Sequence, residues 1–128
     1  MYAEGHRKLG MLAYLIKNGS IERGSTLLWD EPEANLNPKL IKELAAVLVV
    51  LSQDVQIIIA THSLFLLREL EILEKKKSNY EDRYFSLYFS KNEIAVQQGD
   101  TSNDIGNIDC LDASLDQSQR YLDAAHEE

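Results

Sequence analysis

The chain has 128 residues, of which 45% are hydrophobic and 27% charged, and these values are typical of one globular domain with a modest core. No apolar stretch is long enough to cross a bilayer, no signal-peptide pattern is present, and the lone cysteine, Cys110, excludes an intrachain disulfide. We therefore expect a cytoplasmic protein with no membrane partner.

The net charge of −8 is unevenly distributed along the chain. Residues 100–128 hold eight acidic residues and one base, Arg120, whereas residues 1–99 are nearly neutral. An acidic tail argues against contacts with nucleic-acid phosphates there, but a DNA partner for residues 1–99 is not excluded. The one basic cluster, Lys75–Lys77, fits the C-terminal end of a helix, where cations oppose the helix dipole.

Helical periodicity predicts a first helix from Glu4 to Lys17. The following segment, Gly19–Thr26, has the glycine spacing of a phosphate-binding loop, with Ser25 where the lysine should stand. A phosphate-binding loop follows a strand and leads into a helix, and this segment does the opposite. We interpret it as a connecting loop.

A strand, a helix and a second strand are predicted next. The first strand is the apolar run Thr26–Trp29 closed by Asp30 and Glu31, the helix starts at Asn37-Pro38 and ends near Ser52, and the second strand is Val55–Ala60. In a strand–helix–strand unit the strands are parallel and their carboxyl ends share one edge, so Asp30, Glu31 and His62 should lie close together. Because strand side chains alternate, Asp30 and Glu31 should point in different directions.

The remainder of the chain predicts one further helix, a hairpin and a last helix. Ser63 should cap a helix that ends near Lys77, the strands Arg83–Ser90 and Glu93–Gln98 should form a hairpin around Lys91-Asn92, Gly99–Asn107 should be a loop, and Leu111–Ala125 should be helical. We therefore expect an α/β fold with parallel strands and flanking helices in residues 1–78, and a hairpin with an acidic helix of the same domain in residues 79–128.

A sheet of two parallel strands would leave one edge unpaired and one face uncovered. Depending on the register of the strands, we expect Leu27, Trp29, Ile57 and Ile59 on or beside that uncovered face. Self-association or a partner chain at this edge is the expected consequence.

Four segments resemble motifs of ATPases with an ABC-type head. Leu27–Pro32 resembles the Walker B motif, Glu33–Asn37 the D-loop, Thr61–Ser63 the switch-histidine segment, and Tyr2–Lys8 the signature motif that opens a helix. In this order they resemble the RecF-like and OLD-like bacterial AAA ATPases, which work in DNA repair and phage defence. The resemblance covers residues 2–70 and implies a partial P-loop NTPase fold, the C-terminal half of a head domain.

The resemblance implies roles for residues at the edge of the sheet. Asp30 would hold Mg²⁺ through water, Glu31 would polarise the attacking water as general base, and His62 would hydrogen-bond near the γ-phosphate of ATP. An acidic turn without chemistry, and a histidine that only caps a helix, are the simpler interpretations of these residues.

The resemblance also implies contacts with a second subunit. Gly5 would face the γ-phosphate of a nucleotide bound by that subunit, together with Ala3 and His6 of the same segment, and Asn35 and Asn37 would line the contact between subunits. A surface position for His6, and a plain helix start for Gly5, are the alternatives.

The chain departs from the family pattern in ways that bear on activity. Ala3 replaces the signature serine, Glu4 replaces its first glycine, and neither a Walker A lysine nor a Q-loop glutamine is present. We therefore expect the isolated chain to be inactive and to bind Mg-ATP weakly, and to need a Walker A-bearing half or a homologous head. A DNA or nuclease partner is a further expectation.

Two other functions compete with this one. A non-hydrolytic interaction module could retain the fold and the dimer surface without nucleotide. A metal nuclease using Asp30, Glu31 and Glu33 is less well supported, because no further ligand set is evident in the sequence.

Overall fold

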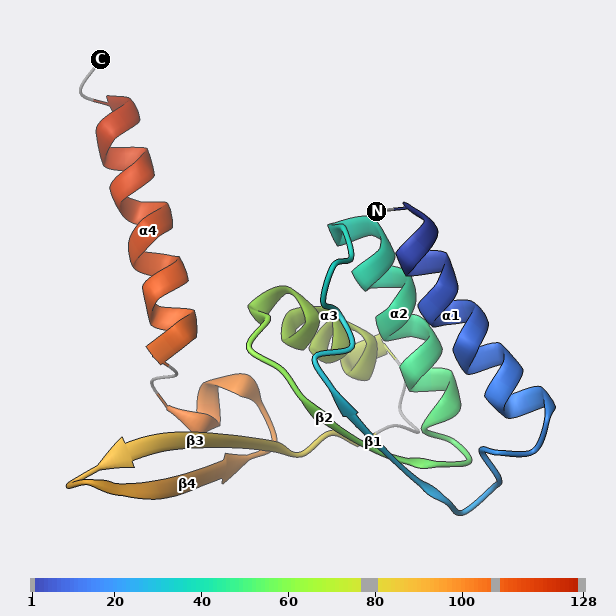
Figure 1. The fold of residues 1–128 in the computed structure, drawn as a ribbon. Coiled ribbons are helices and arrows are strands. Elements are labelled where there is room, and N and C mark those ends of the chain that lie inside the picture. Colours follow the sequence, from blue (N-terminus) through green and yellow to red (C-terminus); the bar gives the residue numbers. More distant parts are fainter. Residues whose placement is uncertain (1, 77–80, 107–108, 127–128) are drawn as a thin grey trace. The chain divides into compact units, whose positions relative to one another are not determined.

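The computed structural model describes residues 2–76, 81–106 and 109–126, which form two compact units, residues 1–81 and 82–128 (Figure 1). The elements in order are α1 (Tyr2–Lys17), β1 (Thr26–Asp30), α2 (Pro38–Leu51), β2 (Gln56–Ala60), α3 (Leu64–Lys76), β3 (Tyr84–Ser90), β4 (Glu93–Gly99), the 3-10 helix η1 (Ser102–Ile105) and α4 (Asp109–His126). The predicted α/β class is confirmed. The predicted boundary after residue 78 falls outside the described residues.

The first unit contains the predicted strand–helix–strand arrangement. β1 and β2 pair in parallel, with Leu28 opposite Ile58 and Asp30 opposite Ala60. The carboxyl ends of both strands therefore lie at one edge, as predicted. β2 starts one residue later than predicted, because the Val55 N–H donates to Leu51 O at 3.1 Å in the turn after α2, and the bond to the neighbouring strand segment begins with the Gln56 N–H.

Helix α2 is the centre of the first unit, and its ends are those that the sequence predicts. Asn37 caps it, since its Oδ1 accepts a hydrogen bond from the Leu40 N–H at 3.0 Å, and Pro38 follows as the first helical residue. One side of α2 packs with α1, Val55 and the strands, and the other side packs with α3. The buried residues on the side of α1 and the strands are Leu12, Leu44, Leu48, Leu51 and Val55. Those on the side of α3 are Ile41, Ala45, Val49, Leu66 and Leu70.

The two faces of the β1–β2 sheet differ from the prediction. Leu27, Trp29, Ile57 and Ile59 are half-buried and pack against the core, so their expected place on or beside the uncovered face is wrong. The uncovered face instead carries Leu28 and Ile58, which are 73% and 50% exposed. The register places Leu28 and Ile58 on one face, and the residues of α1 and α2 pack on the other face.

The segment between α1 and β1 is a connecting loop, as interpreted from the sequence. It leaves a helix and enters a strand, and it is tied to the turn before β2. Gly24 N donates to Asp54 O at 2.6 Å, and Arg23 Nε lies 2.9 Å from Asp54 Oδ1. These contacts stabilise the loop at the amino ends of the strands, opposite the edge where Asp30 lies.

The second unit is built on the predicted hairpin. Lys91 and Asn92 form its turn with φ angles of 49° and 67°, which is the left-handed pair that a tight two-residue turn requires. The expected loop after β4 is wrong in part, because Ser102–Ile105 form η1. Ser86 is buried beneath it and donates through Oγ to Ile105 O at 2.8 Å.

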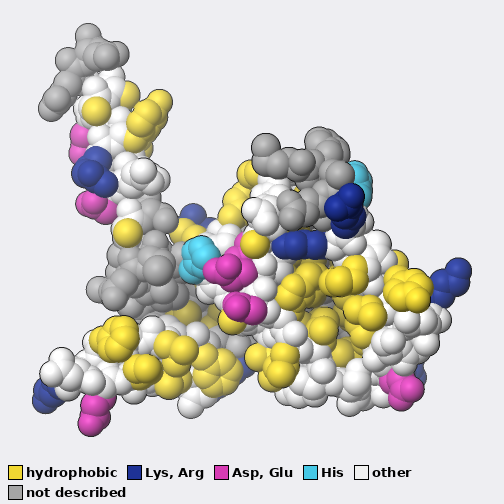
Figure 2. Space-filling model, in the orientation of Figure 1, with side chains coloured by type: hydrophobic (Ala, Val, Ile, Leu, Met, Phe, Trp, Pro, Cys, Tyr) yellow, Lys and Arg dark blue, Asp and Glu magenta, His cyan; other side chains and the backbone are white. Residues whose placement is uncertain are grey.

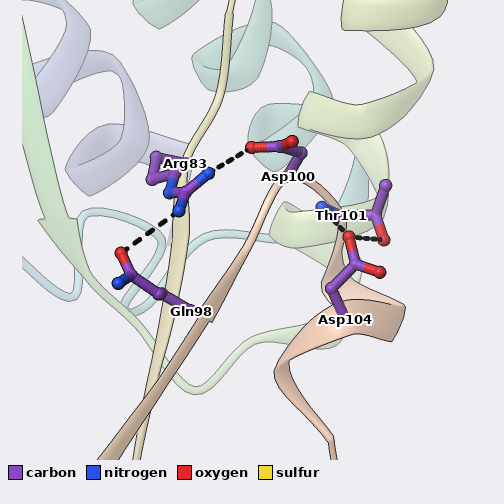
Figure 3. Close-up of polar contacts among 5 residues, drawn as sticks. All are labelled: Arg83, Gln98, Asp100, Thr101 and Asp104. Carbon is purple, nitrogen blue, oxygen red and sulfur yellow. Dashed lines mark hydrogen bonds and ion pairs between the residues drawn. The ribbon is translucent and has the colours of Figure 1, made fainter.

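Polar side chains connect β3 to the residues after β4 (Figure 3). Arg83 binds Asp100 at 2.6 Å and Gln98 at 3.3 Å, and Asp104 Oδ2 accepts hydrogen bonds from the Thr101 hydroxyl at 2.8 Å and the Thr101 N–H at 2.9 Å. The Thr101 hydroxyl, followed by its backbone N–H, lowers the pKa of Asp104. This cluster holds η1 against the end of the hairpin.

The hairpin leaves its apolar face exposed, and Figure 2 shows hydrophobic side chains gathered over it. This exposed hairpin face consists of Phe85, Leu87, Phe89, Ile94 and Val96.

No helix of the described residues is long and apolar enough to span a membrane.

Candidate functional site

The carboxyl ends of β1 and β2 bring Glu31 and His62 together. His62 Nδ1 lies 2.7 Å from Glu31 Oε1, although 31 residues separate them in the chain. The parallel register, with Asp30 opposite Ala60, places the residues after each strand side by side. The predicted convergence is therefore confirmed for Glu31 and His62, and Asp30 lies next to them at the last position of β1.

Glu31 lies just beyond the strand and has a left-handed backbone with φ of 47°. Its N–H still donates to Ala60 O at 2.7 Å, so it extends the ladder by one bond while the chain turns. A left-handed conformation costs a residue other than glycine about 1–3 kcal/mol, and such strain is common at functional sites. The prediction that strand alternation separates Asp30 from Glu31 does not apply, because β1 ends at Asp30.

Water can reach both members of the pair. The side chain of Glu31 is 45% exposed and that of His62 is 67% exposed. An exposed pair of this kind adds little to stability, about 0–1 kcal/mol, so its geometry is not explained by folding. The exposure leaves room for a ligand at the strand ends.

A second polar contact lies next to this pair. Glu33 is buried, and its Oε1 accepts a hydrogen bond from Thr61 Oγ1 at 2.5 Å. Thr61 Oγ1 also accepts from the Ser63 N–H at 3.0 Å, and Ser63 caps α3 as predicted, since its Oγ accepts from the Leu66 N–H at 3.2 Å. The sequence places Glu33 in the D-loop segment and among the acids of the nuclease alternative, and it does not predict this contact.

Lys8 of α1 holds the turn that contains Glu33. Its Nζ donates to Pro32 O at 3.2 Å and to Ala34 O at 2.6 Å. Sequence reasoning missed Lys8 as well. The available signal was its position one helical turn after Gly5, within the segment that resembles the signature motif.

The remaining predicted residues lie at three places in the first unit. Ala3 and Gly5 belong to the first turn of α1, and their side chains lie outside the described residues. His6 is exposed, Asn35 is exposed with φ of 64°, and Asn37 caps α2. Their expected contacts with nucleotide or a second subunit stay predictions.

The carboxylates at the strand ends fit a magnesium ion whose other ligands would be water and a substrate phosphate. Asp30 is an exposed carboxylate beside Glu31, and Mg²⁺ is commonly held by one or two carboxylates, waters and substrate phosphates. Within the described residues, no group of three or more His, Cys, Asp or Glu could hold a metal by itself. Glu33, the third acid of the nuclease alternative, is buried and contacts Thr61 through Oε1.

The chain is similar to known proteins in sequence and in fold. A family model described as "AAA domain, putative AbiEii toxin, Type IV TA system" matches residues 2–68. No curated protein matches the chain.

Among solved structures, the chain is similar to one described as "Structural biochemistry of ATP-driven dimerization and DNA stimulated activation of SMC ATPases". The TM-score is 0.56 at 15% identity, over 90% of this chain and 60% of that chain. A second structure, "Crystal structure of the SmcHead bound to the C-winged helix domain of ScpA", gives a TM-score of 0.48 at 17% identity, over 61% of this chain and 21% of that chain.

The likeness to the first structure shows the fold, and the chain spans about 60% of its length. The family model covers more than half of this chain and includes every residue of the site. The chain therefore belongs to this family of AAA domains, and its fold is that of part of an ABC-type ATPase head.

Proposed function

We propose that this chain is the part of an ABC-type AAA ATPase that supplies the Walker B, D-loop, switch-histidine and signature segments. The Glu31–His62 contact of 2.7 Å at the joint ends of two parallel strands carries this proposal. No Walker A sequence occurs in the 128 residues, so the proposal requires that loop from another chain or from another part of the protein.

In the proposed reaction Glu31 is the general base. Its half-exposed carboxylate takes a proton from a water as that water attacks the γ-phosphorus of ATP, and ADP leaves with the electron pair of the broken bond. When both ring nitrogens of His62 carry a proton, Nδ1 donates to Glu31 and Nε2 can donate to a phosphate oxygen. Asp30 would hold Mg²⁺ through water, and that ion would neutralise phosphate charge.

The proposed partner is a second, homologous head. The first of the similar solved structures concerns ATP-driven dimerization and DNA stimulated activation of SMC ATPases. By analogy, Ala3, Gly5 and His6 at the start of α1 would contact the nucleotide of the second head, and Asn35 and Asn37 would line the contact between heads. The proposed setting is DNA repair or phage defence in the cytoplasm.

The test is a Glu31→Gln substitution in an assembly that includes a Walker A-bearing partner. The amide retains the shape of the carboxylate but cannot accept the proton, so turnover should fall about 10²–10⁴-fold while bound nucleotide is retained. Phosphate release and nucleotide content are the measurements. Glu43→Gln, an exposed glutamate on α2, is the matched control and should hydrolyse ATP at the wild-type rate. Undiminished hydrolysis in the Glu31→Gln assembly would remove Glu31 from the mechanism.

A second candidate function is a non-hydrolytic interaction module. The exposed hairpin face favours it, because five apolar side chains on one side of two strands form the kind of patch that binds proteins. An assembly that forms with its Walker A-bearing partner but releases no phosphate would support this alternative.

A further inference from the structure

Glu33 is a buried carboxylate that the proposed reaction does not use. It is 7% exposed, its Oε1 accepts from Thr61 Oγ1, and its Oε2 has no hydrogen-bond partner among the described residues. A buried carboxylate with one unsatisfied oxygen lowers stability relative to an apolar side chain of similar size. Its place in the structure therefore needs an explanation other than folding.

The bond to Glu33 fixes the backbone on both sides of His62. The single proton of the Thr61 hydroxyl is used for Glu33, and the same oxygen accepts the Ser63 N–H. Ser63 is in turn fixed as the cap of α3. His62 thus lies between two residues whose positions depend on the Thr61 hydroxyl.

Glu33 is itself held in a fixed turn. Lys8 donates to the carbonyl groups on either side of it, those of Pro32 and Ala34. The Ala34 N–H donates to Glu31 O at 3.1 Å, which closes the turn onto Glu31. The Glu33–Thr61 bond therefore connects the segment that follows Glu31 to the segment that precedes His62.

We propose that Glu33 is a positioning residue that holds His62 against Glu31 through the hydroxyl of Thr61. Two exposed side chains lose rotamer freedom when they stay in contact, and their attraction in water is small. A backbone that already places them together removes part of that cost. The inference rests on the proposed function only for the chemical role of the pair, since the contact itself exists without nucleotide.

The test uses NMR on the 128-residue chain and follows the ring signals of His62, which a His62→Gln variant identifies among the three histidines. The signals should shift when Glu31 is replaced by Gln, because the contact is lost. In a Thr61→Val background this response should fall to about half or less of its wild-type size, as expected when coupling between two residues depends on a third. Thr61→Ser keeps the hydroxyl and should restore the full response.

Thr26→Val is the matched control. It removes the same hydroxyl from the opposite end of the strand pair, where Thr26 Oγ1 contacts Gln56 Oε1 at 3.3 Å. The response of His62 to Glu31→Gln should be unchanged in this background. An equal response in the Thr61→Val and wild-type chains would overturn the proposal.

Removing the hydroxyl beside a buried carboxylate can unfold the unit, so Glu33→Gln serves as a second variant and Trp29 fluorescence reports folding. A folded Glu33→Gln chain should also show a reduced response, because a neutral amide is a poorer acceptor for Thr61 than a carboxylate. If neither variant folds, Glu33 serves the fold and the positioning role is wrong.

In the assembled head, Thr61→Val should lower kcat and leave KM for ATP unchanged. Unchanged hydrolysis despite a reduced His62 response would instead contradict the proposed function.

Discussion

The two units treat their apolar side chains in opposite ways. In the first unit, α2 buries apolar residues on two sides, against α1 and the strands and against α3. In the second unit, the apolar side of the hairpin is exposed, and the buried side carries Tyr84 and Ser86. The hydrophobic pattern therefore identifies the buried sides of α2. It does not identify the buried side of the hairpin, because η1 covers that side through polar contacts.

The largest expected effect tests this difference through two leucines. Leu44 of α2 is 0% exposed, so Leu44→Ala should lower the free energy of unfolding by about 2–5 kcal/mol through lost contacts and a cavity. Leu87 of β3 is 72% exposed, so Leu87→Ala should change it by about 0.5 kcal/mol or less. Urea unfolding followed by Trp29 fluorescence and circular dichroism is the measurement. Equal losses in the two variants would mean that the hairpin face is covered in solution, and the comparison would fail.

Much of the first unit can be predicted from its sequence, because its local signals agree with its packing. Asn37 and Pro38 mark the start of α2, Ser63 marks the start of α3, and both caps are present. The parallel order of the strands follows from chain topology, and it correctly places His62 beside Glu31.

The sequence does not reveal which face of each sheet is covered or which polar side chains meet across the site. The faces of Leu27 and Leu28 are exchanged relative to the prediction, because two apolar neighbours on a strand carry no sign of which one faces the core. The Glu33–Thr61 bond joins residues that are 28 positions apart in the chain, and it depends on a turn that Lys8 of α1 holds in place. Periodicity contains no information about such contacts.

The next prediction compares two glycines, one in each unit. A Cβ built at Gly99 would overlap the Cβ of Asp104, whereas one built at Gly10 in α1 meets nothing within 4 Å. Gly99→Ala should therefore move η1 away from β4 and cost about 1–3 kcal/mol in the second unit. Gly10→Ala should stabilise α1 by about 0.5–1 kcal/mol, since alanine loses less backbone entropy in a helix.

Hydrogen exchange of the β4 amides measures the first effect, and thermal unfolding measures the second. Unchanged exchange protection in the Gly99→Ala chain would show that η1 does not pack on β4 in solution. That result would remove the polar cover of the hairpin on which the comparison of the two units depends.

The smallest expected effect is a pH dependence of that polar cover. Hydrogen bonds from Thr101, first from its hydroxyl and then from its backbone N–H, lower the pKa of Asp104 below its ordinary value of 3.8. A carboxyl whose pKa is lowered by folding contributes stability above its unfolded pKa and loses it as pH falls through the folded pKa. The second unit should therefore lose a small part of its stability below pH 3.8, and the loss is small because the group is fully exposed.

Thr101→Val removes the hydroxyl and keeps the N–H, so the pKa of Asp104 should rise toward 3.8 without reaching it. Thr101→Ser retains the hydroxyl and should titrate like the wild type. NMR titration of the Asp104 carboxyl is the measurement, with the exchange protection of β4 followed over the same acidic range. Identical titration of Asp104 in the valine and wild-type chains would mean that the capping contact of η1 is not formed. In that case two contacts would have to hold η1 against the hairpin independently of pH. They are the buried Ser86–Ile105 contact and the hydrogen bond that Gln97 Nε2 donates to Asp104 O at 3.0 Å.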